Sequence, residues 1–255
     1  MTPLTALYVP GSRQDRFNKA ATSGADMVIL DLEDSVAPDA KQEARAAVCR
    51  WLPQAGVPVQ VRVNAPGSAE LTMDLASLPG DVEIRLPKVA DVHDLDQVVG
   101  RQVHVILESA LGVERAFDIA NRPEVIGLAL GEADLAAELG IDGDQGFAWI
   151  RSRIVVAAAA AGLTPPMMSA FAHVADTDLL AQSCAAGRQL GLRGRAAIHP
   201  AQLPVIRSAF APTEQEHLWA EEVLAVLRHA GVATLSDGSM VDAAMARRAR
   251  RITEG

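Results

Sequence analysis

The stretch VIGLALGEADLAAELG, residues 125–140, contains the pattern that decides the fold. Its first six residues are apolar enough to be buried on both faces, as in a strand of a parallel sheet. The run ends at Gly131, and two carboxylates, Glu132 and Asp134, follow at once. Asp134 could simply cap a helix that begins at Leu135, because an aspartate side chain accepts from the free N–H groups at a helix start. The stretch predicts a buried strand followed directly by a helix.

The same unit recurs along the chain. Short segments rich in β-branched or aliphatic residues are each followed by turn or polar residues, which is the pattern of strands. The eight segments are residues 4–10, 26–33, 58–64, 81–88, 104–109, 125–131, 165–171 and 195–200. The seventh is the least regular, because it opens with two prolines. Helix-like stretches lie between these segments, and strands that alternate with helices pair in parallel.

Eight such units predict an α/β fold, a (β/α)8 TIM barrel. The competing fold is an open doubly wound sheet, which usually carries a Gly-rich phosphate turn after its first strand. Here the first turn, PGSR at residues 10–13, has a single glycine. Two more helix-like segments follow the last strand. We therefore expect residues 1–210 to form a barrel that carries the active site, and residues 211–255 to form a C-terminal helical extension at a subunit interface.

The composition limits the classes of partner. Hydrophobic residues make up 49% of the chain but aromatic residues only 4%, so the core must consist mainly of Ala, Val, Leu and Ile. A net charge of −9 argues against nonspecific nucleic-acid binding, which needs a basic surface. Cys49 and Cys184 fit neither a metal-ligand spacing nor a disulfide framework. With no signal-peptide pattern and no apolar run long enough to cross a bilayer, the sequence predicts a soluble cytoplasmic protein without a membrane partner.

Polar side chains stand at the end of almost every predicted strand. The active site of a (β/α)8 barrel lies at the C-terminal ends of its strands. Reading those ends in order gives Ser12, Arg13, Glu33, Asp34, Arg62, Asn64, Lys88, Glu108, Glu132, Asp134, Ser169 and His199. Because so many charges of both signs converge on one rim, the whole set predicts a binding site.

Each position also has a structural explanation when it is taken alone. Glu33 or Asp34 could form an ion pair with Lys88, and Arg62 could join the same network. Ser109 could cap a helix. His199 could simply donate to a backbone carbonyl. These alternatives make predictions about individual contacts, which the structure can test.

The acids of the rim suggest a hard divalent cation. Carboxylates without a His or Cys cluster suit Mg²⁺, or Mn²⁺, which leaves some positions to water and substrate oxygens. Glu108 and Asp134 end consecutive strands and lie 134 − 108 = 26 residues apart, so neighbouring strands would bring them to one ion. Arg62 could hold a carboxylate through two parallel hydrogen bonds. Together these residues predict a site for a 2-oxo or 2-hydroxy acid.

Seven short motifs occur in an order that is typical of one family. They are LYVPG at 7–11, DLEDSV at 31–36, RVN at 62–64, LPK at 86–88, ES at 108–109, GEADL at 131–135 and GRAAIHPAQ at 194–202. On these motifs, which span about residues 1–245, the chain resembles the β subunit of citrate lyase and the malyl-CoA and citramalyl-CoA lyases. These enzymes belong to the metal-dependent aldolase-like barrels.

The resemblance implies roles for particular positions. Glu108 and Asp134 match the family's Mg²⁺ ligands, and Arg62 matches the arginine that binds the oxo-acid carboxylate. The residues that this comparison and the rim together assign to substrate or thioester-carrier binding are Tyr8, Arg13, Lys19, Arg62, Glu108, Glu132 and His199.

The C-terminal motif DGSMVD, residues 237–242, resembles a family element whose last acid reaches into the site of an adjacent subunit. That acid corresponds to Asp242, which would act as a catalytic residue together with Arg62. Ala243 and Ala244 follow it, where the family element has a proline one residue further on. The resemblance also implies a homo-oligomer, most simply a homotrimer.

The expected function is Mg²⁺-dependent cleavage of a short hydroxyacyl thioester, of citryl, malyl or citramalyl type. The products are an oxo acid such as oxaloacetate and an acyl thioester of CoA or of a carrier protein. Three alternatives stay open at this point. They are a Schiff-base aldolase using Lys88, a metal-dependent aldolase acting on a free 2-oxo acid, and a non-catalytic subunit that binds an oxo acid or thioester within a complex.

Overall fold

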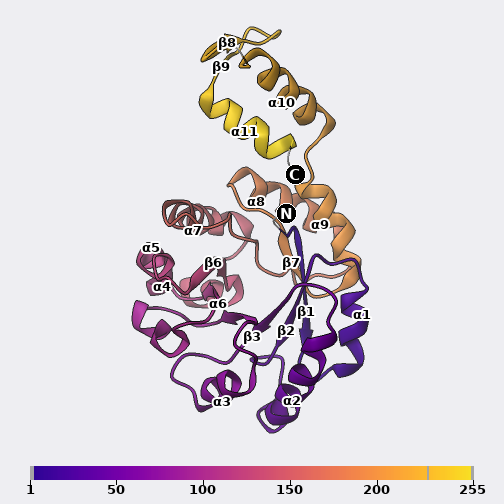
Figure 1. The fold of residues 1–255 in the computed structure, drawn as a ribbon, viewed down its shortest axis with the longest axis vertical. Helices are drawn as coiled ribbons and strands as arrows, with labels where there is room; N and C mark the ends of the chain where they lie inside the picture. The colour runs from indigo at the N-terminus through magenta and orange to yellow at the C-terminus, as the bar shows by residue number, and fades with distance from the viewer. Residues whose placement is uncertain (1–2, 229, 254–255) are drawn as a thin grey trace. The chain divides into compact units, whose positions relative to one another are not determined.

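The structure is a computed structural model that describes residues 3–228 and 230–253. These residues fall into two compact units, one that ends at Phe210 and one that begins at Ala211. Figure 1 shows the chain coloured from its N-terminus to its C-terminus. Each unit has its own hydrophobic core.

The first unit is built on a curled sheet of parallel strands. The strands are β1 (Thr5–Pro10), β2 (Met27–Asp31), β3 (Val59–Arg62), β4 (Glu83–Leu86), β5 (Val103–Leu107), β6 (Val125–Leu130) and β7 (Arg195–Ala197). Their order is β6-β5-β4-β3-β2-β1-β7, so neighbours in sequence are neighbours in the sheet, and β1 joins the first strands to the last. The predicted α/β architecture, a (β/α)8-type barrel, is confirmed.

The predicted strand at residues 165–171 is the exception. Only Met168 forms a β-bridge there, with Arg195, flanked by two hydrogen bonds of 3.0 Å. Pro165 and Pro166 have no N–H to donate, which prevents a longer ladder. On the other side, the Ser169 hydroxyl donates to the Leu130 carbonyl over 2.6 Å. The barrel therefore closes through one bridge and several separate hydrogen bonds, and the prediction of a full seventh strand was wrong.

Helices surround the sheet (Figure 1). They are α1 (Phe17–Ala21), α2 (Lys41–Trp51), α3 (Ala69–Ser77), α4 (Ala110–Glu114), α5 (Ala116–Ala120), α6 (Glu132–Leu139), α7 (Ala148–Ala160), α8 (Thr177–Gln189) and α9 (Leu203–Phe210). The predicted helix after β4 is instead a 3-10 helix, η4 (Val92–Val98). Side-chain caps fix several helix starts: Ser68 caps α3, Asp176 caps α8, and Ser109 caps α4 as predicted.

Alternation along the strands separates the core from the cavity. On β3 and β4, Val61, Ile84 and Leu86 are fully buried in the aliphatic core. Their neighbours Arg62 and Arg85 line a cavity instead. Since successive side chains of a strand point to opposite faces, the polar residues project into the barrel while the aliphatic ones pack outside it. This period-two pattern directs the charges of the rim toward one space.

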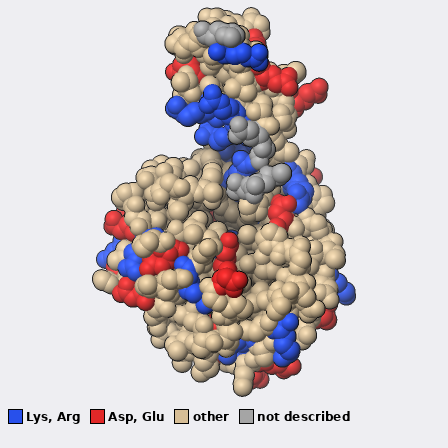
Figure 2. All heavy atoms as spheres, in the orientation of Figure 1, with Lys and Arg blue, Asp and Glu red and all other residues tan. Residues whose placement is uncertain are grey.

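The second unit contains two helices and a small sheet that the sequence did not predict. Helix α10 (Glu214–Val226) is followed by an antiparallel pair, β8 (Val232–Thr234) and β9 (Met240–Asp242), and then by α11 (Ala243–Thr253). A few aliphatic residues form its core, and the Arg248 guanidinium lies 4.8 Å from the centre of the Trp219 ring. Figure 2 shows a basic patch over α11, which carries Arg247, Arg248, Arg250 and Arg251.

Within the described ranges, every helix is too short or too polar to span a lipid bilayer.

Candidate active site

Arg62 is held at the rim by acids from the neighbouring strand. Strand pairing sets Arg62 beside Asp31. The Arg62 Nε and Nη2 atoms donate to the two Asp31 carboxylate oxygens, each over 2.7 Å, and Nη1 lies 2.9 Å from Glu33 Oε2. The guanidinium also lies over the Tyr8 ring, 5.5 Å from its centre. Although burial opposes it, this pairing keeps the pKa of Asp31 below its usual range. The predicted participation of Arg62 in an ion network is confirmed.

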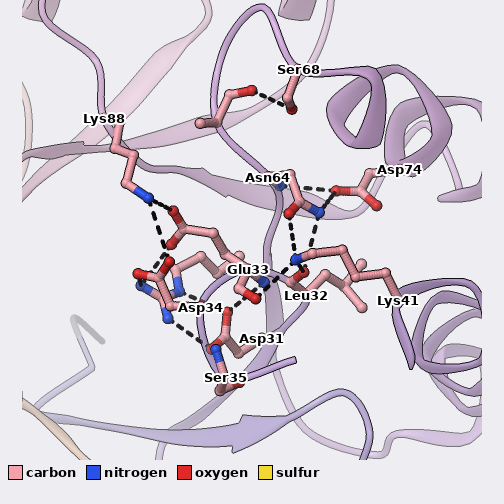
Figure 3. A network of polar contacts seen from close by, with 12 residues as sticks. Asp31, Leu32, Glu33, Asp34, Ser35, Lys41, Asn64, Ser68, Asp74 and Lys88 are labelled. Carbon is pink, nitrogen blue, oxygen red and sulfur yellow. Dashed lines mark hydrogen bonds and ion pairs between the residues drawn. The ribbon is translucent and has the colours of Figure 1, made fainter. Parts of the chain in front are cut away.

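Lys88 is the second cation of this network. Its Nζ lies 2.6 Å from Glu33 Oε1 and 3.4 Å from Asp34 Oδ1. Figure 3 marks both contacts with dashed lines. The hydrogen bond to Glu33 raises the pKa of Lys88, so the amine stays protonated. A Schiff base needs a neutral amine, and this site offers the opposite environment. The prediction of an ion pair is confirmed, and the Schiff-base alternative is disfavoured.

The peptide backbone behind these acids is fixed by Lys41 and Asn64. The Lys41 ammonium donates to the carbonyls of Leu32 and Glu33, over 2.8 and 2.9 Å, and to Asn64 Oδ1 over 2.7 Å (Figure 3). Asn64 in turn donates twice to Asp74, through its backbone N–H and its side chain. Asn64 therefore lies in a buried support for the rim and does not face the cavity as the sequence suggested. Nothing in the local sequence pointed to Lys41.

Glu108, at the end of β5, is a buried acid with an unused oxygen. Only 8% of the residue is exposed, and Oε2 has no hydrogen-bond partner among the described residues. Gly131, opposite it at the end of β6, makes room for this side chain: a Cβ on Gly131 would overlap the Glu108 Cγ. Burial, together with the negative charges of Glu33 and Asp134, raises the pKa of Glu108 to about 7.

Asp134 lies in the first turn of α6. This helix begins at Glu132, with Gly131 as its N-cap residue, and no side chain caps it. The prediction that Asp134 caps a helix starting at Leu135 was wrong, because the helix begins three residues earlier. The exposed carboxylate accepts no hydrogen bond within the part of the chain that the structure describes.

This pair of acids fits a hard divalent cation. Among the described residues, no cluster of three or more His, Cys, Asp or Glu side chains could hold a metal. A buried oxygen without a partner beside a second free carboxylate is nevertheless the donor set that Mg²⁺ uses, since Mg²⁺ takes one or two protein carboxylates. Glu108 would lose its proton when a cation binds, because metal ligands must be deprotonated.

The raised pKa of Glu108 gives a prediction for stability. A carboxyl with an ordinary pKa of 4.5 and a folded-state pKa of about 7 stabilises the fold when protonated. That contribution, about 3 kcal/mol, is present below pH 4.5 and is lost as the pH rises through 7. In chelator, the free energy of unfolding of the wild type should fall relative to that of Glu108→Gln between pH 4.5 and 8. Urea titrations of both proteins measure this difference, and parallel pH profiles would contradict it.

Glu132 occupies a position that the sequence did not predict. Its carboxylate is bound by Arg151 of α7, with Nε–Oε1 and Nη2–Oε2 distances of 2.7 and 3.0 Å. It still lines the same cavity as Glu108 and Asp134. The carboxylate that the sequence assigned to substrate binding is therefore engaged by Arg151 at the edge of the cavity.

One cavity of about 410 Å³ brings the main candidates together. Of the predicted site residues, it is lined by Tyr8, Arg62, Glu108, Glu132 and Asp134. Arg16 and Arg85 line it as well, and the sequence reading missed both. Arg85 could have been predicted to face the cavity, because it is paired on β4 with Arg62 on β3 and therefore points to the same side of the sheet.

A second pocket, of about 390 Å³, adjoins this cavity and is lined by three further candidates. Arg13, Lys19 and His199 line it, and Tyr8 and Arg16 line both spaces. The Arg13 guanidinium is paired with Asp15 over 2.8 Å, whereas the side chains of Arg16 and Lys19 make no hydrogen bond or ion pair in the described ranges.

His199 does not donate to a carbonyl as predicted. Its Nδ1 instead accepts from the Ala201 N–H over 3.2 Å, which caps the 3-10 turn η6 (Pro200–Gln202). A residue N-terminal to a proline at the first position of such a turn is well placed to cap it. The ring remains exposed beside the second pocket.

Comparison with known proteins identifies the family. The model of the HpcH/HpaI aldolase/citrate lyase family matches residues 4–200. The chain belongs to this family. The resemblance seen in the seven motifs is thus confirmed.

Several known proteins of this family are similar to this chain over nearly its whole length. The citrate lyase subunit beta-like protein of Mycobacterium tuberculosis H37Rv is 35% identical, over 92% of this chain and 89% of the relative. The L-malyl-CoA/beta-methylmalyl-CoA lyase of Cereibacter sphaeroides is 32% identical, over 96% and 92%. A (3S)-malyl-CoA thioesterase of C. sphaeroides is 30% identical, over 93% and 89%. CitE of M. tuberculosis, solved with magnesium, acetoacetate and coenzyme A, has a TM-score of 0.86 at 30% identity, over 99% of this chain and 97% of that one.

Asp242 lies in the second unit of this family member. Its Oδ1 accepts from the backbone N–H groups of Ala244 and Met245, over 2.8 and 3.3 Å, at the start of α11. The structural alternative for this residue, a helix cap, is therefore present. A cap leaves the second carboxylate oxygen available to other groups.

Proposed function

We propose that this protein is a Mg²⁺-dependent carbon–carbon lyase that cleaves a short hydroxyacyl thioester of citryl, malyl or citramalyl type. The products are an oxo acid and an acyl thioester, and Mn²⁺ is the alternative ion. The observation that carries the proposal is one cavity that is lined by Glu108, directly after β5, by Asp134, in the first turn of the helix after β6, and by Arg62. Relatives named as malyl-CoA lyase and citrate lyase beta-like protein support the reaction class.

Glu108 and Asp134 are proposed to hold the ion. Bound Mg²⁺ would supply Lewis-acid polarisation of the substrate oxygens. The structure of the related CitE in complex with magnesium supports magnesium as the ion. The buried position of Glu108 keeps one ligand fixed, while exposed Asp134 supplies the second from the start of α6.

Arg62 is proposed to orient the oxo-acid carboxylate. Asp31 and Glu33 hold its guanidinium in one position before substrate binds, and this reduces the ordering cost of binding. The adjoining pocket suits the thioester carrier, CoA or an acyl-carrier protein. Arg16 and Lys19 both line it, and their side-chain charges are free of hydrogen bonds and ion pairs in the described ranges.

A metal-dependent mechanism and a Schiff-base mechanism at Lys88 predict opposite effects of chelator and of borohydride. We expect chelator to abolish turnover of the hydroxyacyl thioester and excess Mg²⁺ to restore it. Borohydride added with substrate should trap no adduct at Lys88, because the amine is held protonated by Glu33. Mass spectrometry of the treated protein checks this. A substrate-dependent adduct at Lys88, or full turnover in chelator, would overturn the proposed mechanism.

We further propose a homotrimer in which Asp242 of one subunit acts at the metal site of the next. When the carbon–carbon bond breaks, the thioester enolate carbon must take up a proton, and Asp242 is the candidate donor. Ala246 and Ala249 of α11 pack inside the second unit, whereas the exposed arginines Arg247, Arg250 and Arg251 form a basic face that suits contact with another subunit. The second unit would then lie at the subunit interface.

Mixed oligomers test this arrangement. Asp134→Asn and Asp242→Asn should each be inactive alone. Co-assembled, they should regain partial activity, because some interfaces pair an intact metal site with an intact Asp242. Light scattering and differential tags establish that mixing has occurred. If proven mixed oligomers show no recovery and Asp242→Asn alone is fully active, Asp242 serves only as the cap of α11. If Asp242→Asn is inactive and mixing restores nothing, the site is not shared between subunits.

A further inference from the structure

Arg151, on α7, binds Glu132, one of the acids that line the cavity. It is the largest fully buried side chain described in the protein, with 1% of the residue exposed. Its guanidinium binds Glu132 through Nε and Nη2, over 2.7 and 3.0 Å, and Asp144 through Nη1 and Nη2, over 3.0 and 2.8 Å. Two carboxylates are thus each bound through two parallel hydrogen bonds, a geometry that lysine cannot reproduce.

We call Arg151 with its two bound carboxylates, Glu132 and Asp144, the Arg151 clamp. Asp144, on the side away from the cavity, is itself held by further hydrogen bonds. Asp144 Oδ1 accepts from the Ser183 hydroxyl over 3.1 Å, and Arg195 Nη1 donates to the same hydroxyl oxygen over 2.9 Å. Arg195 Nε donates to the Ser169 carbonyl over 3.0 Å. These part-buried and buried contacts hold the Arg151 guanidinium from the side opposite Glu132.

Without this clamp, a third carboxylate would be free in the metal cavity. Glu132 is two residues from Asp134 on the first turn of α6, and it lines the same cavity as Asp134 and Glu108. A divalent cation attracts every unpaired carboxylate within reach. Mg²⁺ has six octahedral positions, so a third protein carboxylate would occupy one that substrate or water would otherwise take.

We propose that Arg151 is a positioning residue that withholds Glu132 from the metal. The site thereby keeps two carboxylate ligands and leaves coordination positions open for an anionic oxo acid. This inference rests on the proposed Mg²⁺ site at Glu108 and Asp134. The Arg151–Glu132 pair would then favour binding of the oxo acid to the metal over binding of a third protein carboxylate.

Removing Arg151 should therefore change two affinities in opposite directions. In Arg151→Met, calorimetric titration should show Mg²⁺ binding about tenfold more tightly, and oxaloacetate binding to the Mg²⁺-loaded protein about tenfold or more weakly. The double variant Arg151→Met/Glu132→Gln should return both affinities close to the wild-type values, because a neutral amide does not compete for Mg²⁺. If Arg151 were merely structural, both affinities would fall together and the second substitution would not restore them.

Asp144→Asn is the matched control. It weakens the other half of the same clamp while Arg151 keeps its two hydrogen bonds to Glu132, so it should lower stability and leave both affinities close to wild type. If Arg151→Met does not fold, Arg151→Lys should give the same opposite shifts with smaller size. Parallel losses of both affinities in the Arg151 variants would overturn this inference alone. A wild-type protein that binds no Mg²⁺ would instead overturn the proposed metal site.

Discussion

Replacing Asp134 with asparagine is expected to lower turnover by roughly 10³-fold or more, since a metal ligand contributes several kcal/mol to the transition state. Mg²⁺ affinity should fall by about 100-fold in the same variant, because a neutral amide is a poor substitute for a carboxylate. Calorimetry with Mg²⁺ and an assay of oxo-acid release measure the two effects. The fold should be nearly unaffected, because Asp134 is exposed and accepts no hydrogen bond within the described ranges.

Asp142→Asn provides the control for charge. Asp142 is an exposed acid shortly after α6 without a hydrogen bond or ion pair in the described part of the chain. Its substitution changes the net charge equally but should leave metal binding and turnover unchanged. If Asp134 served only as an acid near a helix N-terminus, its loss would cost about 0.3–1 kcal/mol of stability and no metal affinity. Wild-type Mg²⁺ binding by Asp134→Asn would contradict the assignment.

Replacing Arg62 with methionine should damage both stability and substrate binding. It leaves Asp31, which is 2% exposed, as a buried carboxylate without its cation, and it leaves Glu33, which is 4% exposed, with Lys88 as its remaining cation. Breaking such a pair costs about 3–5 kcal/mol of unfolding free energy. The KM for the thioester should rise and kcat should fall, because the oxo-acid carboxylate is no longer oriented. Urea titration and steady-state kinetics separate the two effects.

Two further variants make this prediction specific. Arg62→Lys restores a charge but not the two parallel hydrogen bonds, so it should recover stability better than turnover. Lys88→Met removes the other, half-exposed partner of Glu33 and should cost about 1 kcal/mol or less. Should Lys88→Met lose as much activity as Arg62→Met, Lys88 would have a catalytic role that the ion pair does not explain.

Much of the barrel could be predicted because its signals are local. The alternation of Val61 and Arg62, or of Ile84 and Arg85, is visible within a few residues and fixes which side chains enter the barrel. The convergence of Glu108 and Asp134 follows from chain order alone, since consecutive strands pair in this fold. The predicted start of α6, Leu135, lies three residues after the observed start, Glu132. The prediction relied on a capping side chain, and the N-cap residue Gly131 has none.

The supporting contacts could not be predicted, because they join residues that are distant in sequence. Arg151 meets Glu132 from another helix, and Lys41 meets Asn64 across 23 residues. No periodicity or spacing marks such partners, since many arginines and lysines would fit the same pattern. At residues 165–171 the local sequence pattern predicted an element that does not form. Its apolar residues indicated a strand, but the ladder depends on N–H groups that Pro165 and Pro166 lack.

The most direct test of the central claim is product analysis with purified protein, Mg²⁺ and a panel of citryl-, malyl- and citramalyl-CoA. Mass spectrometry should detect an oxo acid and an acyl-CoA in equal amounts from at least one substrate, with no products in chelator. Release of free CoA and an intact hydroxy acid would show hydrolysis instead of carbon–carbon cleavage. That result, or equal cleavage of the free hydroxy acid without a thioester, would contradict the proposed function, as would the absence of any turnover with Mg²⁺.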